Sequence, residues 1–570
     1  MSSYKEAKEA FVADNPGSSV FHVSAVSAAA FTAYALYALA ARRYRSPTMD
    51  WVTMVLPTLL AVTTFADRVL LLNGAMAAAA VLLWLGAPVP QPPPKPKGQW
   101  LDESDSDEDA EPLSPGPRSP LVSGVKLPSQ VVAESLAQAR ASASGSSPTS
   151  LQPPIEPRRR RSPSPTSPVH TIDIASAPAS PKPAAPRTDR AVPKLAVPRP
   201  SERTARGDTL LPFLSVYRAH MMLMTVHAIL AVDFPVFPRV LGKCENFGTS
   251  LMDIGVGSFV FSLGIVSSRT FSPRSGRRRW IPALVGALRR AAPVLALGFI
   301  RLLMVKGSEY PEHLTEYGVH WNFFFTLGLV PALATALLPL RRFLRWTTIG
   351  LLLTAVQQLV LSNTGLQTFL LSAARPGLLG ENKEGIASMP GYGAIFLLGL
   401  SAGDKVLRVS APPKADEDGG GRRLSSQQLS ERATRRKTQL AFELVSYATI
   451  SWAALALSYA LGIEVSRRFA NLPYVVWTVA YNTTALALYL AIELWLFPPA
   501  SVAPPCPPLL DAINRNGLVV FLVANLLTGL INVSMQTMYA GTFVSMTILT
   551  AYSAGVSAFA WAIRGHRIKL

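Results

Sequence analysis

Five ionisable residues are gathered in residues 231–253, among aromatic and apolar neighbours. They are Asp233, Arg239, Lys243, Glu245 and Asp253. A partly desolvated carboxylate such as Asp233 could take the proton of a hydroxyl nucleophile. Lys243 could orient that carboxylate or stabilise an oxyanion. These residue types are compatible with a general base and a cationic stabiliser, but their spacing alone favours an ion-paired loop that only fixes the ends of two helices.

The same segment contains two prolines that restrict its backbone. Pro235 and Pro238 end a preceding helix and favour an extended path. Extended backbone at membrane depth must line a cavity or pack within protein, because lipid offers no hydrogen-bond partner. We therefore expect this segment to shape a polar site at the end of two membrane helices.

A second polar cluster comprises Glu309, His313, Glu316, His320 and Asn322. Histidines with acids can bind zinc. However, the two histidines are seven residues apart, unlike the i, i+4 pair of a metalloprotease helix, and no cysteine is near. We predict no metal site here, and anchoring at the membrane interface by neighbouring aromatic residues is the structural alternative.

Two further stretches combine polar and small residues. Residues 381–392 contain Asn382 and Lys383 and suit a re-entrant or pocket-lining element before a weakly apolar segment. Residues 467–474 contain Asn471 and run into the next apolar block.

That apolar block contains Tyr481 and Asn482. Asn482 starts a glycosylation sequon, but it lies inside an expected membrane span, so we do not expect glycosylation there. Asn525 and Asn532, in the following span, could serve only as interhelical hydrogen-bonding groups.

These stretches must be positioned by membrane helices. Of the 570 residues, 49% are hydrophobic and only 16% are charged, whereas soluble chains have about a quarter charged. Apolar blocks of about 18 to 25 residues match the length that a helix needs to cross a bilayer. The fold class expected is therefore an all-α polytopic membrane protein with about 13 transmembrane helices. The expected spans are 19–41, 51–66, 69–86, 211–232, 250–267, 291–305, 321–340, 346–361, 392–407, 440–461, 474–496, 518–535 and 540–563.

Composition divides the chain into three parts. Residues 1–88 hold an N-terminal tail and three spans, residues 89–208 are rich in Pro, Ser and charge, and residues 209–570 hold about ten spans. The middle part cannot bury enough apolar surface to offset its ordering entropy, so we predict a long disordered linker.

Residues 280–290 look amphipathic and could lie in the membrane interface.

The net charge of +19 reflects basic loops and not a nucleic-acid surface. We find no nucleic-acid-binding motif. With the predicted spans, the basic loops all fall on one side of the membrane, which predicts a cytosolic linker and C-terminus and a luminal N-terminus. Cys244 and Cys506 would then lie on opposite faces, so no disulfide is expected.

Other chemistries lack sequence support. We find no Walker loop, Rossmann fingerprint, nucleophile elbow or cysteine–histidine zinc pattern. A transporter or lipid-handling protein without covalent chemistry stays open as an alternative, because intramembrane Asp and Arg also suit ion pathways.

The chain resembles the GPI-anchored wall transfer protein family, the GPI-inositol acyltransferases of the endoplasmic reticulum. The resemblance covers nearly the whole membrane part but not the linker, and the block from Asp-Phe-Pro to Met-Asp is long and specific. Its motifs are residues 4–12, Tyr217-Arg218, 233–239, Lys243, 248–262, 316–325, 382–386, 390–392, 470–474, 480–483 and 525–532.

The resemblance implies transfer of a long acyl chain, typically palmitoyl, from acyl-CoA to the inositol of glucosaminyl-phosphatidylinositol. It implies Asp233 and Lys243 as the catalytic pair, a luminal reaction in the endoplasmic reticulum membrane, and acyl-CoA as co-substrate with no bound cofactor. The partners expected are acyl-CoA, the acceptor lipid and membrane lipids, with no nucleic acid. Substrate-binding candidates are Arg218, Arg239, Glu245, Asp253, His320, Asn322, Asn382, Lys383, Asn471, Tyr481 and Asn482.

This chain departs from the family pattern at two places. Val240 stands where the family often has a second arginine, which weakens any role for a cation there. The linker is longer than the family's connection at this point and is better suited to regulation than to catalysis.

Overall fold

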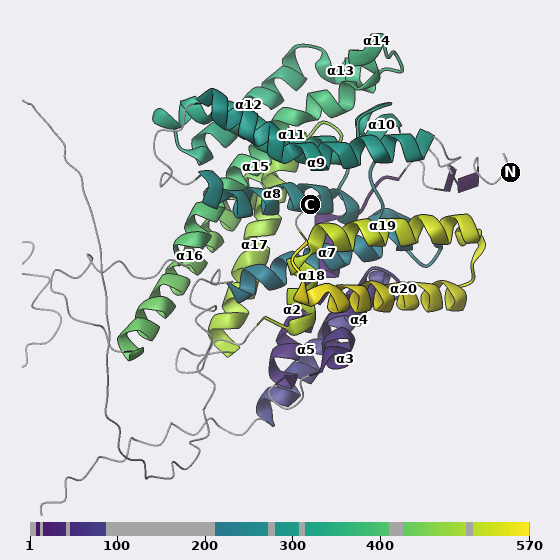
Figure 1. Cartoon of the computed structure of the whole chain (residues 1–570), viewed down its shortest axis with the longest axis vertical. Helices are drawn as coiled ribbons and strands as arrows, with labels where there is room; N and C mark the ends of the chain where they lie inside the picture. Colours follow the sequence, from purple (N-terminus) through teal and green to yellow (C-terminus); the bar gives the residue numbers. More distant parts are fainter. Residues whose placement is uncertain are drawn as a thin grey trace, which may run out of the picture. The chain divides into compact units, whose positions relative to one another are not determined.

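The computed structural model describes residues 7–8, 10–11, 15–41, 46–86, 211–271, 280–306, 314–409, 426–496 and 506–568. These residues are helical, and their only pairing of extended backbone is an isolated bridge between Ser18 and Thr249. Residues 1–89 and 202–570 form one compact unit. The predicted disordered linker, residues 89–208, lies outside the described residues. The helices are shown in Figure 1.

The following bounds define the helices of the described part. They are α2 (Val20–Ala40), α3 (Pro47–Asp50), η1 (Trp51–Val55), α4 (Leu56–Ala61), η2 (Ala66–Arg68), α5 (Val69–Leu85), α7 (Pro212–Ala231), η4 (Arg239–Leu241), α8 (Leu251–Phe271), α9 (Trp280–Lys306), α10 (Leu314–Tyr317), α11 (Phe323–Ala336), η5 (Leu338–Arg342), α12 (Trp346–Asn363), α13 (Leu366–Leu371), α14 (Gly377–Glu381), α15 (Lys383–Val409), α16 (Ser426–Ala460), α17 (Leu472–Leu496), α18 (Pro508–Arg515), α19 (Gly517–Ser534), η7 (Thr537–Tyr539), α20 (Thr542–Ala562) and η8 (Ile563–Gly565).

Within the described ranges, 10 helical segments are long and apolar enough to cross a membrane. They contain α2, α5, α7, α8, α9, α15, α16, α17, α19 and α20. These segments coincide with ten of the expected spans, and the predicted class, an all-α polytopic membrane protein, is confirmed.

The other three expected spans are shorter or more polar. The span expected at 51–66 is divided into the π-helical turn η1 and the short α4. Helix α11 has only 14 residues. Helix α12 has 18 residues, but polar side chains such as Gln357 and Gln358 reduce its hydropathy.

Of two local expectations, one stays a prediction and the other was wrong. The amphipathic segment 280–290 continues without a break into α9, and its location in the membrane interface stays a prediction. Residues 383–392 are not a re-entrant loop, because they form the first turns of the 27-residue α15. The weakly apolar segment 392–407 is thus part of a long helix, and Pro390 is accommodated inside it.

Glycines allow α8 and α15 to approach closely. A Cβ atom on Gly264 would collide with the carbonyl oxygen of Phe396, and one on Gly399 would collide with the carbonyl oxygen of Phe261. Small residues at such crossings favour helix association in lipid, where no hydrophobic effect drives it. Helices α8 and α15 form the most extensive helix pair of the described part, and Figure 1 shows them side by side.

This close approach can be tested with Gly399→Val. The added side chain meets backbone that cannot move aside, so we expect a loss of roughly 1–3 kcal/mol in stability, as for overpacked cores. The matched control is Gly529→Val in α19, where a Cβ would meet nothing within 4 Å. Thermal unfolding of the detergent-solubilised chain measures both, and equal midpoints for the two variants would contradict the packing argument.

Candidate active site

The α7–α8 loop, residues 232–250, follows the irregular path that its prolines predict. Helix α7 ends at Ala231, and α8 begins at Leu251. Nη2 of Arg239 donates to the carbonyl oxygens of Val232 and Phe237 at 2.6 and 3.3 Å. Burial lowers the pKa of Arg239 to about 10. In this structure Arg239 therefore stabilises the loop backbone, and its substrate contact stays a prediction.

Asp233 lies in a buried polar cluster at the start of this loop. Its Oδ1 is 3.1 Å from Nζ of Lys8. Its Oδ2 accepts a hydrogen bond of 2.8 Å from Nδ2 of Asn532 in α19. Lys8 also donates to Oδ1 of Asn532 at 2.9 Å, so the three side chains form a closed triangle. The N-terminal segment thus contacts the candidate catalytic carboxylate directly.

Lys243 has a different partner from the one expected. Its Nζ lies 2.8 and 2.9 Å from the two carboxylate oxygens of Glu316 in α10. No contact joins Lys243 to Asp233 in the described part of the chain, so Lys243 does not orient Asp233 in this structure, and the role of the two residues toward a substrate stays a prediction. The reason is that residues far apart in sequence, Lys8 and Glu316, neutralise each group separately.

A large cavity extends from the Lys243–Glu316 pair along α8. Its volume is about 970 Å³, and its lining on α8 begins at Leu251 and ends at Phe271. That length of helix spans about 30 Å, the thickness of a hydrocarbon core. The volume falls at the upper end of the range of about 300–1,000 Å³ for small-molecule sites. The cavity therefore has room for a long amphiphile oriented across the membrane.

The two sides of the cavity differ in polarity. Helix α11 contributes mainly apolar residues, such as Phe323, Phe324 and Leu327. Helices α7 and α17 contribute polar ones, including Arg218 and Asn482. An apolar chain and a polar group could thus lie in the same cavity against different helices.

The cavity separates the sequence-predicted residues into two groups. The lining contains five of them, namely Arg218, Lys243, Asn322, Tyr481 and Asn482. The others lie outside the lining, namely Asp233, Arg239, Glu245, Asp253, His320, Asn382, Lys383 and Asn471.

Asp253 forms a fully buried ion pair at the start of α8. Its Oδ1 is 2.6 Å from Nε of Arg467. Its Oδ2 accepts hydrogen bonds from the backbone of Cys244 and the hydroxyl of Ser250. Burial opposes the charged form of Arg467, but the interactions with Asp253, Glu316 and the nearby tyrosines together outweigh this effect and raise the pKa of Arg467. Asp253 therefore links the α7–α8 loop to the α16–α17 loop in this structure.

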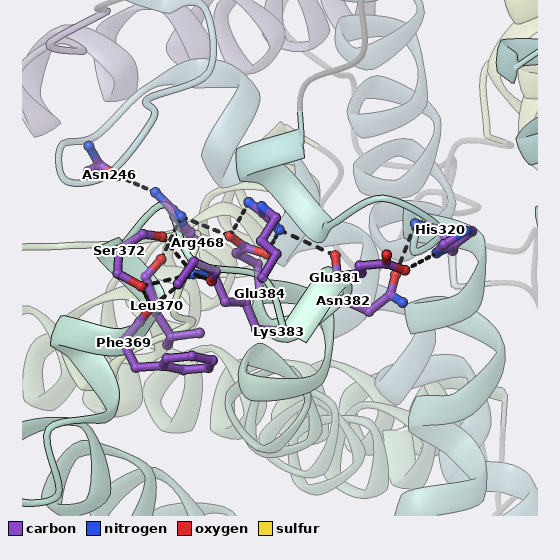
Figure 2. Close-up of polar contacts among 12 residues, drawn as sticks. Asn246, His320, Phe369, Leu370, Ser372, Glu381, Asn382, Lys383, Glu384 and Arg468 are labelled. Carbon is purple, nitrogen blue, oxygen red and sulfur yellow. Dashed lines mark hydrogen bonds and ion pairs between the residues drawn. The ribbon is translucent and has the colours of Figure 1, made fainter. Parts of the chain in front are cut away.

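A second buried charge network surrounds Glu384 in α15 (Figure 2). Its carboxylate pairs with Arg375 at 2.7 Å and with Arg468 at 2.9 Å. Arg468 also donates to Oδ1 of Asn246 in the α7–α8 loop. Lys383 donates to the carbonyl oxygens of Phe369, Ser372 and Ala374, so it satisfies acceptors at and beyond the end of α13.

The other predicted polar residues also make contacts within the protein. Oδ1 of Asn382 accepts from the backbone N–H groups of His320 and Trp321, as Figure 2 shows for His320. Oδ1 of Asn471 accepts from the backbone of Ser466 and Tyr474. Substrate contacts by these residues stay predictions.

Asn322 combines two local roles with its place in the cavity lining. Its side chain caps α11 by accepting from the backbone of Phe324 at 3.0 Å, and it donates to the carbonyl oxygen of Gly298 at 2.9 Å. Glu245 is half-buried within the α7–α8 loop.

The described residues contain no group of three metal-binding side chains of His, Cys, Asp or Glu type. Part of the second sequence cluster, Glu309 and His313, lies outside the described residues.

Cys244 is adjacent to Lys243, but burial and the neighbouring Asp253 raise the pKa of its thiol. A buried thiol of raised pKa is a poor nucleophile, which disfavours a covalent intermediate on this cysteine.

The fold and the site define a class of protein: a polytopic membrane protein with a deep intramembrane cavity and a lysine–carboxylate pair at one end. The sequence profile of the GWT1 family matches residues 4–124 and 170–563. The chain belongs to the GWT1 family.

Relatives from several fungi have similar sequences. The GPI-anchored wall transfer protein 1 of Cryptococcus neoformans var. neoformans serotype D (strain B-3501A) is 44% identical over 615 aligned residues, which cover 100% of both chains. The protein of the same name from Yarrowia lipolytica (strain CLIB 122 / E 150) is 43% identical over 376 residues, which cover 64% of this chain and 75% of its relative.

Sequence reasoning missed three residues that determine the site geometry. Lys8 lies in the family motif at residues 4–12, but its position in the sequence did not indicate a contact with Asp233. Asn532 was interpreted only as an interhelical hydrogen-bonding group, whereas its side chain donates a hydrogen bond to Asp233. Glu316 was assigned to a separate cluster, whereas it pairs with Lys243. A polar residue at each position was the available signal, but the pairing depends on the tertiary fold.

The buried pair of Asp253 and Arg467 gives a stability prediction. Arg467→Met leaves the Asp253 charge without its ion-pair partner in the interior, so we expect a loss of about 3–5 kcal/mol. The control is Lys405→Met, which breaks an ion pair with Glu443 whose side chains are 31% and 33% exposed. Such a pair contributes only about 0–1 kcal/mol.

Thermal unfolding of both variants measures the difference. A double variant, Asp253→Leu with Arg467→Met, should recover part of the loss, because it removes both charges. Equal midpoints for the Arg467 and Lys405 variants would show that the buried pair has no special role.

Proposed function

We propose that this chain is an acyltransferase of GPI-anchor biosynthesis. It would transfer a long acyl chain, such as palmitoyl, from acyl-CoA to an inositol hydroxyl of glucosaminyl-phosphatidylinositol. The proposed location is the endoplasmic reticulum membrane, with the N-terminus luminal and the C-terminus cytosolic. The names of its curated relatives, GPI-anchored wall transfer protein 1, support a transfer reaction that concerns GPI anchors.

The observation that carries this proposal is the position of Lys243 at one end of a long, largely apolar cavity. An acyl chain gains about 0.8 kcal/mol for each methylene that leaves water, so the apolar wall along α11 favours a long chain. With the chain along this wall, the thioester would lie near Lys243. The ammonium group could then stabilise the negative charge that develops on the thioester oxygen.

The proposed reaction is a direct transfer. The inositol oxygen forms a bond to the thioester carbonyl carbon, and the carbon–sulfur bond breaks. The hydroxyl proton passes to a carboxylate and then to the departing CoA thiolate, which leaves as the free thiol. The high pKa of the Cys244 thiol favours this direct route over an acyl-enzyme on that residue.

Two carboxylates are candidates for the general base. Asp233 is the residue that the sequence predicts, and it would have to exchange its contacts with Lys8 and Asn532 for a contact with the substrate. Glu316 already lines the cavity beside Lys243. We assign the base to Asp233 and the cation to Lys243, with Glu316 as the residue that positions Lys243.

This assignment predicts different outcomes for three variants. Lys243→Ala should lose about 10²–10³-fold in turnover, as for removal of an oxyanion donor. Asp233→Asn should lose about 10²–10⁴-fold, as for removal of a general base. Glu316→Gln should retain more activity than either, because it removes the charge that positions Lys243 but keeps a hydrogen-bonding group.

The measurement is mass spectrometry of the lipid formed by the purified chain from acyl-CoA and glucosaminyl-phosphatidylinositol. The control is Lys405→Ala, far from the cavity lining, which should keep wild-type turnover. Normal turnover in both Asp233→Asn and Lys243→Ala would overturn the assignment. No acylated lipid from the wild-type chain would favour a transporter or lipid-handling protein.

The apolar wall predicts a dependence on acyl-chain length. Each methylene should lower the KM of the acyl donor about fourfold until the cavity is filled, from about 0.8 kcal/mol per methylene. Leu327→Trp, on the cavity side of α11, should shift the preference toward shorter chains. Leu329→Trp, on the same helix but outside the cavity lining, should not. KM values for donors of 12 to 18 carbons measure this shift, and the same preference in both variants would contradict an acyl chain along α11.

A further inference from the structure

Arg218 is a cation that has no ion-pair partner among the described residues. It lies on α7 and lines the cavity. Its Nε atom is buried and makes no hydrogen bond, and no ion pair or hydrogen bond joins its guanidinium to any described residue. Two neighbouring polar side chains are already engaged with each other and with the backbone, since the hydroxyl of Tyr217 donates to Oδ1 of Asn482 at 2.6 Å, and Nδ2 of Asn482 donates to the carbonyl oxygen of Thr478.

The other charged groups around the cavity do not compensate Arg218. The described lining has five basic side chains, Arg218, Lys243, Arg290, Arg301 and Arg515, and one acidic side chain, Glu316. Glu316 pairs with Lys243, and Arg515 pairs with Asp511. The cavity is therefore strongly positive. An unpaired charge at membrane depth is costly, and such residues face a water-filled cavity or a ligand.

Buried charges elsewhere in the described part do have partners. Arg467 pairs with Asp253, Arg468 pairs with Glu384, and Lys437 pairs with Glu493. The contrast shows that this fold can neutralise buried cations with its own carboxylates. At Arg218 it supplies none among the described residues, although the side chain lines the cavity of about 970 Å³.

We propose that Arg218 binds a phosphate ester of an amphiphilic substrate inside the cavity. The planar guanidinium can donate two parallel hydrogen bonds to phosphate oxygens, and the anion would neutralise the charge. The identity of the ligand rests on the proposed function, which involves two phosphate-bearing substrates. CoA carries a diphosphate and a 3′-phosphate, and the acceptor lipid carries a phosphodiester.

The geometry favours the CoA diphosphate. Arg218 precedes the end of α7 by 13 residues, which is about 20 Å along the helix axis. The phosphodiester of the acceptor is bonded to the inositol ring itself, so it must stay near the reacting hydroxyl and Lys243. In CoA, the pantetheine arm separates the diphosphate from the thioester. With the thioester near Lys243, this arm would extend along the polar wall of α7 and α17 toward Arg218.

The test compares ligand-induced thermal stabilisation of the purified full-length chain. Four ligands are used: palmitoyl-CoA, palmitoyl-pantetheine, phosphatidylinositol and diacylglycerol. Palmitoyl-CoA carries the phosphates and the adenosine that palmitoyl-pantetheine lacks, and phosphatidylinositol carries the phosphodiester and the inositol that diacylglycerol lacks. Ligand binding raises the unfolding temperature according to affinity. The variants are Arg218→Gln and Arg218→Lys, with Arg408→Gln, an exposed arginine of α15, as the control.

We expect Arg218→Gln to bind palmitoyl-CoA about 10- to 100-fold more weakly, as for loss of a hydrogen bond to a charged group. Its binding of palmitoyl-pantetheine should be unchanged, and Arg218→Lys should bind palmitoyl-CoA with intermediate affinity. Without ligand, Arg218→Gln should be at least as stable as the wild type, because it removes an uncompensated charge. If Arg218 had a purely structural role, Arg218→Gln without ligand would be less stable than the wild type.

Each other outcome has a defined meaning. A selective loss of phosphatidylinositol binding would support the phosphate site but assign it to the acceptor lipid. Wild-type affinity of Arg218→Gln for all four ligands would overturn the proposal, as would a ligand-free protein less stable than Arg408→Gln. If the wild type forms no acylated lipid but still distinguishes palmitoyl-CoA from palmitoyl-pantetheine through Arg218, the proposed function fails and the phosphate site remains.

Discussion

The buried ion pair between Asp253 and Arg467 holds together the segments on which the site depends. One carboxylate oxygen binds Arg467, and the other accepts from the backbone of Cys244 and from Ser250. Cys244 is the residue after Lys243, so this contact fixes the end of the α7–α8 loop against the start of α8. The hydroxyl of Ser466 donates to the carbonyl oxygen of Asn246 and adds a second link between the two loops.

The N-terminal segment completes this arrangement from the other side of the α7–α8 loop. Lys8 contacts Asp233, and Nδ2 of Asn15 donates to the carbonyl oxygen of Lys243 at 3.3 Å. The backbone N–H of Ser18 donates to the carbonyl oxygen of Thr249 at 2.6 Å. The loop is therefore held at its start, middle and end by chain segments far away in sequence. Such support is what a catalytic group needs, because small displacements of reacting groups reduce rate strongly.

The charges of the membrane part follow one electrostatic rule with an informative exception. Most buried ionisable groups pair within the protein, because an isolated charge in a medium of low dielectric is unfavourable. The cavity is the place where basic groups outnumber acidic ones. The positive cavity, its apolar wall along α11 and the lysine at its end together suit an anionic amphiphile better than a neutral lipid. Family membership indicates a transferase role that concerns GPI anchors, and the charge distribution independently supports the anionic substrate proposed above.

The sequence alone determined the class of fold, because the length and hydropathy of a membrane span are local properties of consecutive residues. It also located the α7–α8 loop, since prolines and charges between two apolar blocks are visible without a structure. The local sequence pattern did not predict where α9 and α15 begin. Both helices continue through polar or proline-containing segments, which neighbouring helices stabilise.

Only the tertiary structure decided which charges meet. Asp233 and Lys243 are ten residues apart, yet each is paired with a residue from a distant segment, Lys8 and Glu316. Pairing energy depends on distance and burial in three dimensions, and neither can be obtained from spacing in an irregular loop. For the same reason the sequence could name Arg218 only through a family motif, whereas the structure showed that this cation lies beside a cavity and has no partner among the described residues.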